Sequence, residues 1–329
     1  MEFTQEVKIA TDPIYQKISK VMPEIEWSVH APYIHRINQL KKEKNAIILA
    51  HNYQTPEIYH GVADVAADSL ALAIEAAKTE ADIIVMCGVH FMAETAKLMS
   101  PDKKVLLPDM KAGCSLSSSI TGEDVRNLKK KYPGVPVVSY VNTSADVKAE
   151  TDVCCTSANA VKIVNSLGVK KVIFLPDDYL AKYVASQTDV EIISWKGTCE
   201  VHEQFNDEEI NEIRKNNPGI KIIAHPECPP DVIEASDFAG STSGMIKYVK
   251  DNQPEKVMMV TECSMSDNVQ IDNPNVEFIR PCNLCPHMKR ITLPKILDCL
   301  ENETNELIMD HETIERARKS VERMAEIGR

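Results

Sequence analysis

An internal repeat of short apolar segments is the feature that most constrains the fold of this chain. Nine segments rich in β-branched residues are bounded by Pro, Asp or Gly, and most alternate with segments of helical periodicity. They lie near residues 46–50, 83–87, 104–107, 136–141, 172–175, 190–194, 220–224, 257–260 and 276–279. Strands that are apolar throughout and separated by helices are typical of parallel sheets covered on both faces. The sequence therefore predicts an α/β fold.

Polar landmarks recur at equivalent places and divide the nine predicted strands into three sets of three. The first strand of each set ends in polar residues, at 50–53, 139–142 and 224–227. A hydroxyl residue follows each end after 17 or 18 residues, at Ser69, Ser157 and Thr242. A cysteine follows the third strand of each set, and the spacings of Cys114, Cys199 and Cys285 are 85 and 86 residues. This pattern predicts three βαβαβ units related by pseudo-threefold symmetry.

We predict these units at residues 36–125, 126–208 and 209–300, with an N-terminal leader segment at 1–35 and a C-terminal helix at 301–329. In open α/β sheets, ligands bind beyond the carboxyl ends of the strands. Every landmark lies at such an end. Three units around one axis would therefore share one active site at their common centre. The pattern assigns no role to the leader segment.

Composition limits the partners of the chain. Its 329 residues include 37 basic and 49 acidic side chains, so the formal net charge is −12. No basic patch interrupts this charge, and nucleic acid and anionic membranes are therefore poor partners. The sequence has neither the apolar region of a secretory signal nor the roughly 18 unbroken apolar residues of a membrane span. We expect a cytoplasmic protein, in which ten cysteines favour metal binding over disulfides.

Cys114, Cys199 and Cys285 are the candidate metal ligands. Three thiolates from separate loops suit an iron–sulfur cluster or zinc. In a cubane cluster they would leave one iron without a protein ligand, and that iron could act as a Lewis acid.

The other cysteines are weaker candidates. Cys87 and Cys299 fall on apolar patterns typical of a core, and the adjacent Cys154 and Cys155 would point in different directions. No role is assigned to two further cysteines, Cys228 and Cys282.

Side chains that can exchange protons gather at the predicted strand ends. They are His51, Tyr53, Tyr140, Asn142, His225 and Glu227. Enolisation, imine formation and dehydration need such groups near neutral pH. We predict that four of them are catalytic, namely His51, Tyr140, His225 and Glu227. His202 and His287 lie close to the predicted cysteine ligands, where a supporting role would suit them.

Four hydroxyl residues lie at predicted helix starts, namely Ser69, Ser157, Ser241 and Thr242. Free backbone amides and the positive end of the helix dipole favour anions at such positions. A single hydroxyl there is usually only a helix cap. Equivalent positions around one centre favour a substrate with several carboxylates or a phosphate.

Ten segments together resemble the quinolinate synthase family. They are AHNYQ at 50–54, ADSL at 67–70, CGVHFMAETAK at 87–97, AGCSL at 112–116, YVNTSA at 140–145, TSAN at 156–159, GTCEVH at 197–202, HPEC at 225–228, GSTSG at 240–244 and CPHM at 285–288. The likeness runs in order from about residue 40 to residue 300.

The resemblance implies an enzyme of pyridine nucleotide (NAD) biosynthesis that condenses iminoaspartate with dihydroxyacetone phosphate, giving quinolinate, phosphate and water. It also implies three α/β units in a pseudo-threefold arrangement, and one four-iron four-sulfur (4Fe-4S) cluster held by Cys114, Cys199 and Cys285, with its fourth iron facing the substrate. The substrate pocket that it implies comprises His51, Tyr53, Ser69, Tyr140, Asn142, Ser157, His225, Glu227, Ser241 and Thr242.

Two other functions fit the same residues. A zinc-dependent aldolase or dehydratase would use the same three thiolates. A non-catalytic iron–sulfur carrier or sensor would have no need of His51, Tyr140 and Glu227. For the enzyme, an aspartate-oxidising partner could supply the unstable iminoaspartate, although no segment identifies a surface for it.

Overall fold

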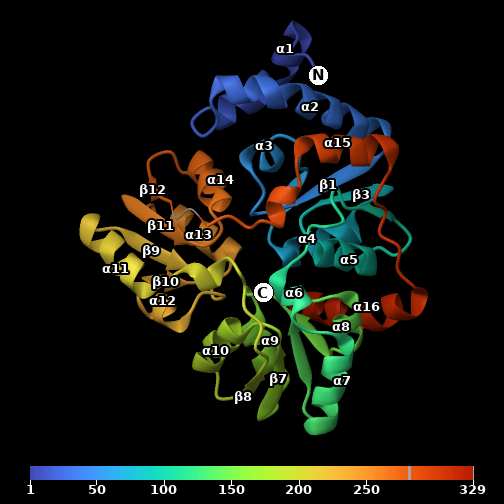
Figure 1. Cartoon of the computed structure of the whole chain (residues 1–329), viewed down its shortest axis with the longest axis vertical. Helices are drawn as coiled ribbons and strands as arrows, with labels where there is room; N and C mark the ends of the chain where they lie inside the picture. Colours follow the sequence, from blue (N-terminus) through green and yellow to red (C-terminus); the bar gives the residue numbers. More distant parts are fainter. Residues whose placement is uncertain (281–282, 329) are drawn as a thin grey trace. The chain divides into compact units, whose positions relative to one another are not determined.

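The computed structural model describes residues 1–280 and 283–328 of the chain (Figure 1). The chain forms two compact units, each assembled from segments that are distant in the sequence. The first comprises Met1–Ala112, Cys263–Pro274 and Leu284–Leu307, and the second comprises Gly113–Glu262, Asn275–Asn283 and Ile308–Arg329. The bounds of the five segments that we predicted from the sequence stay predictions.

The first unit contains one parallel sheet with the strand order β2-β1-β3-β4. Its strands are β1 (Ala46–His51), β2 (Val65–Ala67), β3 (Ile83–Cys87) and β4 (Lys104–Leu106). Its helices are α1 (Gln5–Ile18), α2 (Glu24–Glu43), α3 (Pro56–Tyr59), α4 (Ser69–Lys78), α5 (His90–Met99), α14 (Ser264–Asp272), the 3-10 helix η2 (Met288–Arg290) and α15 (Leu293–Asn302). Helices α2 and α15 pack together on β1 and β3, and α4 packs with α5 along the strands. This cover explains why all of β3 is apolar and buried.

The predicted leader segment is helical and packs within the first unit. Residues 1–35 form α1 and the first part of α2, and Tyr15 stacks on Trp27 with 5.3 Å between the ring centroids. Along α2, Ile34, Ile37 and Leu40 are buried at helical spacing. These side chains bring α2 into contact with β1.

The second unit contains two parallel sheets, with the orders β6-β5-β7-β8 and β10-β9-β11-β12. Their strands are β5 (Val137–Tyr140), β6 (Val153–Cys155), β7 (Lys171–Leu175), β8 (Glu191–Ser194), β9 (Lys221–Ala224), β10 (Phe238–Ala239), β11 (Lys256–Val260) and β12 (Glu277–Ile279). The helices are α6 (Ser115–Ser118), α7 (Gly122–Lys131), α8 (Ala145–Ala149), α9 (Ala160–Ser166), α10 (Asp178–Ser186), the 3-10 helix η1 (His202–Gln204), α11 (Asp207–Asn216), α12 (Pro230–Glu234), α13 (Thr242–Asn252) and α16 (His311–Ile327).

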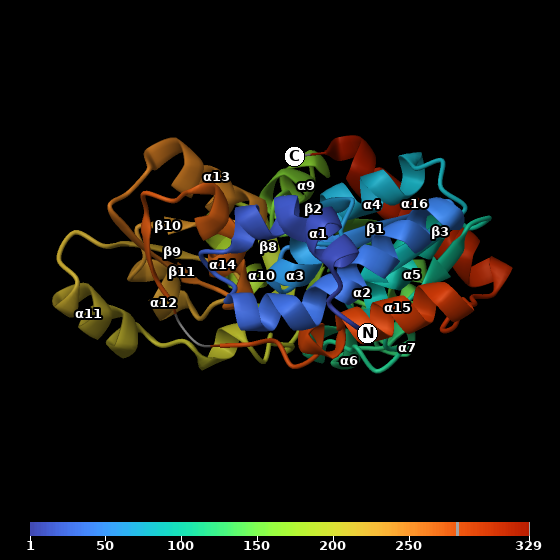
Figure 2. The same ribbon diagram turned by 90° about the horizontal axis from the view of Figure 1, so that it is seen from above.

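Helices cover these two sheets as well. Figure 2 shows α13 on one side of the sheet formed by β9 to β12, and α11 and α12 on the other. Beside the other sheet, the C-terminal helix α16 packs on α8 and β6. The α/β fold with three parallel sheets, predicted from the sequence, is confirmed. No helix in the described ranges has both the length and the apolar character needed to cross a membrane.

All nine predicted strands are present, but the prediction of three strands for each βαβαβ unit was an underestimate. Within the described residues each sheet has four strands, because one short strand pairs with the first strand of each set. The additional strands β2, β6 and β10 have only two or three residues. A strand this short shows no apolar pattern of its own, so sequence periodicity does not find it. Each ends just before one of the hydroxyl landmarks.

The helix start predicted at Ser69 is correct. Helix α4 begins at Ser69, and Asp68 caps it, because its carboxylate accepts from the backbone N–H of Ala71 at 2.9 Å. The start predicted at Ser157 needs correction, since Ser157 lies in a turn before α9, which begins at Ala160. That turn forms because the backbone N–H of Thr156 donates to Asn159 Oδ1 at 2.7 Å. The prediction for the third helix is correct, since Ser241 caps α13.

Candidate active site

The second unit gathers polar side chains at the carboxyl ends of its strands. Tyr140 is the last residue of β5, His225 follows β9 directly, and Glu227 lies two residues further on. All three are buried. The turn after β5 is held by Lys148, whose ammonium group is fully buried and donates to the carbonyls of Val141 and Thr143.

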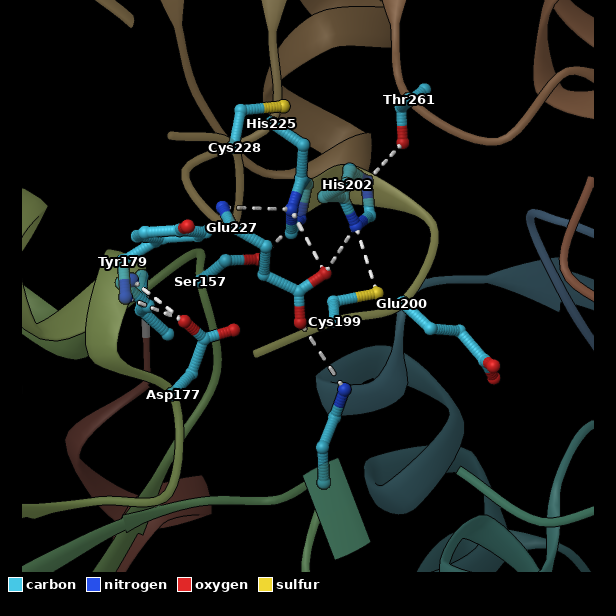
Figure 3. A network of polar contacts seen from close by, with 12 residues as sticks. Ser157, Asp177, Tyr179, Cys199, Glu200, His202, His225, Glu227, Cys228 and Thr261 are labelled. Carbon is cyan, nitrogen blue, oxygen red and sulfur yellow. Dashed lines mark hydrogen bonds and ion pairs between the residues drawn. The ribbon is translucent and has the colours of Figure 1, made fainter. Parts of the chain in front are cut away.

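Glu227 lies at the centre of this network (Figure 3). Its Oε2 lies 2.9 Å from His202 Nδ1 and 3.3 Å from His225 Nδ1. Its Oε1 accepts from Asn142 Nδ2 at 3.4 Å. Glu227 is 3% exposed, so these contacts replace almost all of its hydration.

Its neighbours keep Glu227 charged. Burial alone would raise the pKa of the carboxyl group, but the charges of His202 and then His225 oppose burial and hold the pKa well below its usual range. Glu227 is therefore a carboxylate at neutral pH. A buried carboxylate between two imidazoles can accept or return a proton without reorganisation of water.

His225 links Glu227 to the turn before α9. Its Nε2 lies 3.1 Å from Ser157 Oγ, and its ring stacks on that of His202 with 4.8 Å between centroids. Burial lowers the pKa of His225, and the nearby charge of Glu227 offsets only part of this effect. A histidine in contact with a carboxylate can take up a proton during a reaction and return it.

His202 connects Glu227 to Cys199. Its Nδ1 lies 3.1 Å from Cys199 Sγ as well as near Glu227, and its Nε2 lies 2.9 Å from Thr261 Oγ1. Cys199 Sγ and one donor atom of each of the other two, His202 and Glu227, lie within 4.8 Å of one another, close enough to hold a metal ion. Sequence reasoning gave His202 only a supporting role and missed Thr261. The sequence signal for a larger role of His202 was its position three residues after Cys199.

The loops of Cys114 and Cys199 are adjacent. Ser115 Oγ donates to the carbonyl of Thr198 at 3.0 Å and accepts from the backbone N–H of Glu200 at 3.1 Å. Burial, then the charges of Glu227 and Cys114, raise the pKa of the Cys199 thiol well above its usual range. Such a thiol becomes a thiolate when it coordinates a metal, whose positive charge offsets these effects. Two of the three predicted ligands therefore fit an iron–sulfur cluster or zinc.

The first unit holds four further predicted site residues, namely His51, Tyr53, Ser69 and Cys285. The backbone N–H of Tyr53 donates to His51 Nδ1 at 3.2 Å, and the two rings meet edge to face. Lys289 ties this turn to the loop of Cys285. Its ammonium donates to the carbonyl of Tyr53 at 2.8 Å, and its backbone N–H donates to the carbonyl of Cys285 at 3.1 Å.

The remaining predicted site residues lie at the start of α13. Ser241 Oγ accepts from the backbone N–H of Gly244 at 3.2 Å, and Thr242 begins the helix. Ser157 and Ser241 line one cleft of about 470 Å³, together with Lys162 and Tyr183. The roles that we predicted for all these residues stay predictions.

The other cysteines follow the sequence analysis. Cys87 and Cys299 are buried, as expected for core positions, and Cys154 and Cys155 are also buried. Cys228 is buried too, with its thiol 3.5 Å from the carbonyl of Val260. Cys282 lies outside the described residues.

Comparison with known proteins decides the family. The model of the family described as quinolinate synthetase A protein matches residues 35–326. The chain belongs to this family. It is 60% identical to the quinolinate synthase of Sinorhizobium fredii over 327 residues, which is 99% of this chain and 91% of that one. It is 57% identical to the quinolinate synthase of Caulobacter vibrioides over 329 residues, 99% of this chain and 90% of that one. Family membership identifies an enzyme of quinolinate synthesis and confirms the resemblance seen in the sequence.

Proposed function

We propose that the protein condenses iminoaspartate with dihydroxyacetone phosphate to form quinolinate, releasing phosphate and water, as a step of NAD biosynthesis. The observation that carries this proposal is the buried Glu227–His202–His225 cluster beside Cys199. Condensation, ring closure and dehydration each move protons. This cluster combines a carboxylate with imidazoles that are available for such transfers.

We further propose that Cys114, Cys199 and Cys285 hold one 4Fe-4S cluster. The adjacent loops of Cys114 and Cys199 support the first two ligands. When bound, a cluster with three cysteine ligands supplies a Lewis-acidic iron that can polarise a substrate hydroxyl group. Burial, then Glu227 and Cys114, raise the pKa of Cys199, and the N–H groups of His202 and Val201 oppose this rise in part, which helps a metal to bind the thiolate.

The remaining residues bind and orient the substrates in this proposal. Ser69, Ser157, Ser241 and Thr242 bind the phosphate or the carboxylates, as hydroxyl groups beside free backbone amides can. His51 and Tyr140 polarise the carbonyl group of the triose, with Tyr53 and Asn142 completing the pocket. Glu227 and His225 pass protons between the reacting groups. The 3.1 Å contact between Ser157 and His225 supports a link between anion binding and proton transfer.

Anaerobic purification followed by iron, sulfide and zinc analysis, together with an assay of quinolinate from both substrates, tests this proposal. We expect about four iron and four sulfide per chain and quinolinate formation. A cluster-replete sample that forms no quinolinate would leave the carrier or sensor function instead.

Zinc is the second candidate cofactor, because the set of Cys199, His202 and Glu227 also suits a zinc ion. Zinc without inorganic sulfide in an active sample would favour a zinc-dependent aldolase or dehydratase. An aspartate-oxidising enzyme stays the proposed source of iminoaspartate, and the cytoplasm stays the proposed compartment.

A further inference from the structure

Asp177 is a buried acid beside the site that the proposed mechanism does not use. It follows β7 and has no exposed surface. Its Oδ1 accepts from the backbone N–H groups of Tyr179 and Leu180, both at 2.9 Å, at the start of α10. The side chain is therefore fixed in one orientation.

The backbone around Asp177 is tied to the loop of Cys199. The N–H of Asp178 donates to the carbonyl of Gly197 at 2.8 Å, and the N–H of Gly197 donates to the carbonyl of Pro176 at 3.0 Å. A Cβ atom at position 197 would lie 2.5 Å from that carbonyl oxygen, so only glycine allows this approach. Asp177 is thus held at a constant place relative to Cys199.

The other carboxyl oxygen of Asp177 has no partner. Oδ2 is buried without a hydrogen bond to any described residue, and no cation in the described part of the chain forms an ion pair with Asp177. Asn142 Oδ1 is a second buried oxygen without a partner, and its amide donates to Glu227. In Figure 3 the dashed lines from Asp177 lead only to backbone nitrogens at the start of α10, and none joins it to Glu227. Unpartnered buried polar atoms are costly and rare, and a bound ligand is one way to satisfy them.

The surroundings of Asp177 and Glu227 shift the pKa values of these two acids in opposite directions. Burial, and then the negative charge of Glu227, raise the pKa of Asp177 well above its usual range, and Asp178 adds to this effect. The N–H groups of Leu180 and Tyr179 oppose it only in part. Glu227 stays ionised because two histidines contact it. Two acids whose pKa values a site shifts in opposite directions commonly have different roles in that site.

We propose that Asp177 is a further residue of the active site, whose buried and otherwise unpartnered Oδ2 forms a hydrogen bond with a carboxylate or carbonyl oxygen of the substrate. This inference rests on the proposed function, because it takes the substrate to be a polycarboxylate. A neutral acid can approach such an anion without the repulsion that a second carboxylate beside Glu227 would cause. Asn142 Oδ1 is placed to accept from an N–H or O–H group of the same ligand.

Two substitutions separate ligand binding from the structural cap of α10. In Asp177→Ser the hydroxyl still accepts from the backbone amides, as serine does at helix starts, but the second oxygen is lost. In Asp177→Asn both the acceptor and a donor remain. Asp178→Ser is the matched control, because Asp178 is the next residue, carries the same charge and pairs with Lys182 away from the network.

Calorimetric titration of each anaerobic holoenzyme with quinolinate provides the first readout. We expect Asp177→Ser to weaken binding by about tenfold to a hundredfold, the loss of one or two strong hydrogen bonds, and Asp177→Asn to restore most of it. Asp178→Ser should bind like the wild type. Equal binding by Asp177→Ser and wild type would overturn this inference alone. Absence of binding by the wild type would contradict the proposed function.

Infrared difference spectroscopy provides a second readout that does not depend on activity. At neutral pH we expect the carbonyl stretch of a protonated carboxylic acid, present in wild type and Asp178→Ser and absent from both Asp177 variants. Addition of quinolinate should shift this band, since the acid gains an acceptor. If wild type and Asp177→Asn show the same spectrum in this region, Asp177 is ionised and the inference is wrong.

Discussion

Three side chains that meet at Glu227 come from separate segments of the second unit. Asn142 follows β5, His202 lies in η1, and His225 follows β9. Removing one partner from a buried charged cluster lowers the free energy of unfolding far more than removing one partner of an exposed pair. The remaining buried charge then has neither a partner nor water around it. Substitutions at this cluster should therefore change chemistry and stability together, and the mildest change is the most informative.

Glu227→Gln removes the charge with little change of shape. We expect the iron and sulfide content to stay at the wild-type level while kcat for quinolinate formation falls about 10²-fold or more, because an acid–base group is lost. The measurement is kcat under anaerobic conditions, normalised to iron. Unchanged kcat at equal iron content would contradict proton transfer by Glu227.

Cys199→Ala tests the ligand assignment. Two thiolates hold a cubane poorly, so we expect loss of iron, colour and turnover together. Cys228→Ala is the matched control, since Cys228 is another buried cysteine of the same unit and lies next to Glu227. It should keep its iron. Full iron content in Cys199→Ala, or loss of iron only in Cys228→Ala, would contradict the assignment.

At the scale of elements, one carboxylate that accepts hydrogen bonds from two lysines connects α2, β4 and the end of α15 in the first unit. Glu303, just after α15, accepts from Lys104 in β4 at 2.6 Å and from Lys44 at the end of α2 at 2.8 Å. The hydrogen bond from Lys104, then that from Lys44, lower the pKa of Glu303 from its ordinary 4.5 to about 2. The folded state therefore binds this proton less readily than the unfolded chain does.

Glu303→Gln should thus change how stability depends on pH. A lowered pKa contributes stability that is complete above the ordinary value and is lost as the pH falls to about 2. We expect the wild type to have the higher urea midpoint at pH 6, and the difference to disappear as the pH falls from 4.5 to 2. Glutamine keeps the backbone preference of this position, so a difference that does not depend on pH would point to packing instead of charge.

At the scale of the whole molecule, the sheets do not depend on the candidate metal ligands. Their cores consist of apolar side chains such as Ile48, Phe174 and Ile222, whereas Cys114, Cys199 and Cys285 all lie outside the strands. The fold should therefore persist when a bound metal group is removed.

Anaerobic treatment with a chelator checks this independence. We expect quinolinate formation to stop while the far-ultraviolet circular dichroism stays unchanged, and activity to return after reconstitution with iron and sulfide. A mock-treated sample is the control. Loss of the circular dichroism together with the metal would mean that the cluster stabilises the fold.

The sequence by itself determined the α/β class, the positions of nine strands and the recurrence of polar residues at their carboxyl ends. It could do so because a strand buried between two layers of helices must be apolar on both faces, whereas the loops that follow the strands can carry polar residues. The resemblance to the family rests on the same segments, because the residues that can bind substrates or transfer protons lie at the strand ends.

Only the tertiary structure decided which of these side chains meet. The edge strands β2, β6 and β10 form because a neighbouring strand offers them hydrogen bonds, and no pattern of their own marks them. The contact of His202 with Glu227 joins residues that are 25 positions apart in the chain. That Asp177 keeps an unpartnered oxygen also depends on which groups the fold places around it. Periodicity reports which face of an element is buried. The partner of a buried polar atom depends on how separate elements pack, and that information is spread over the whole chain.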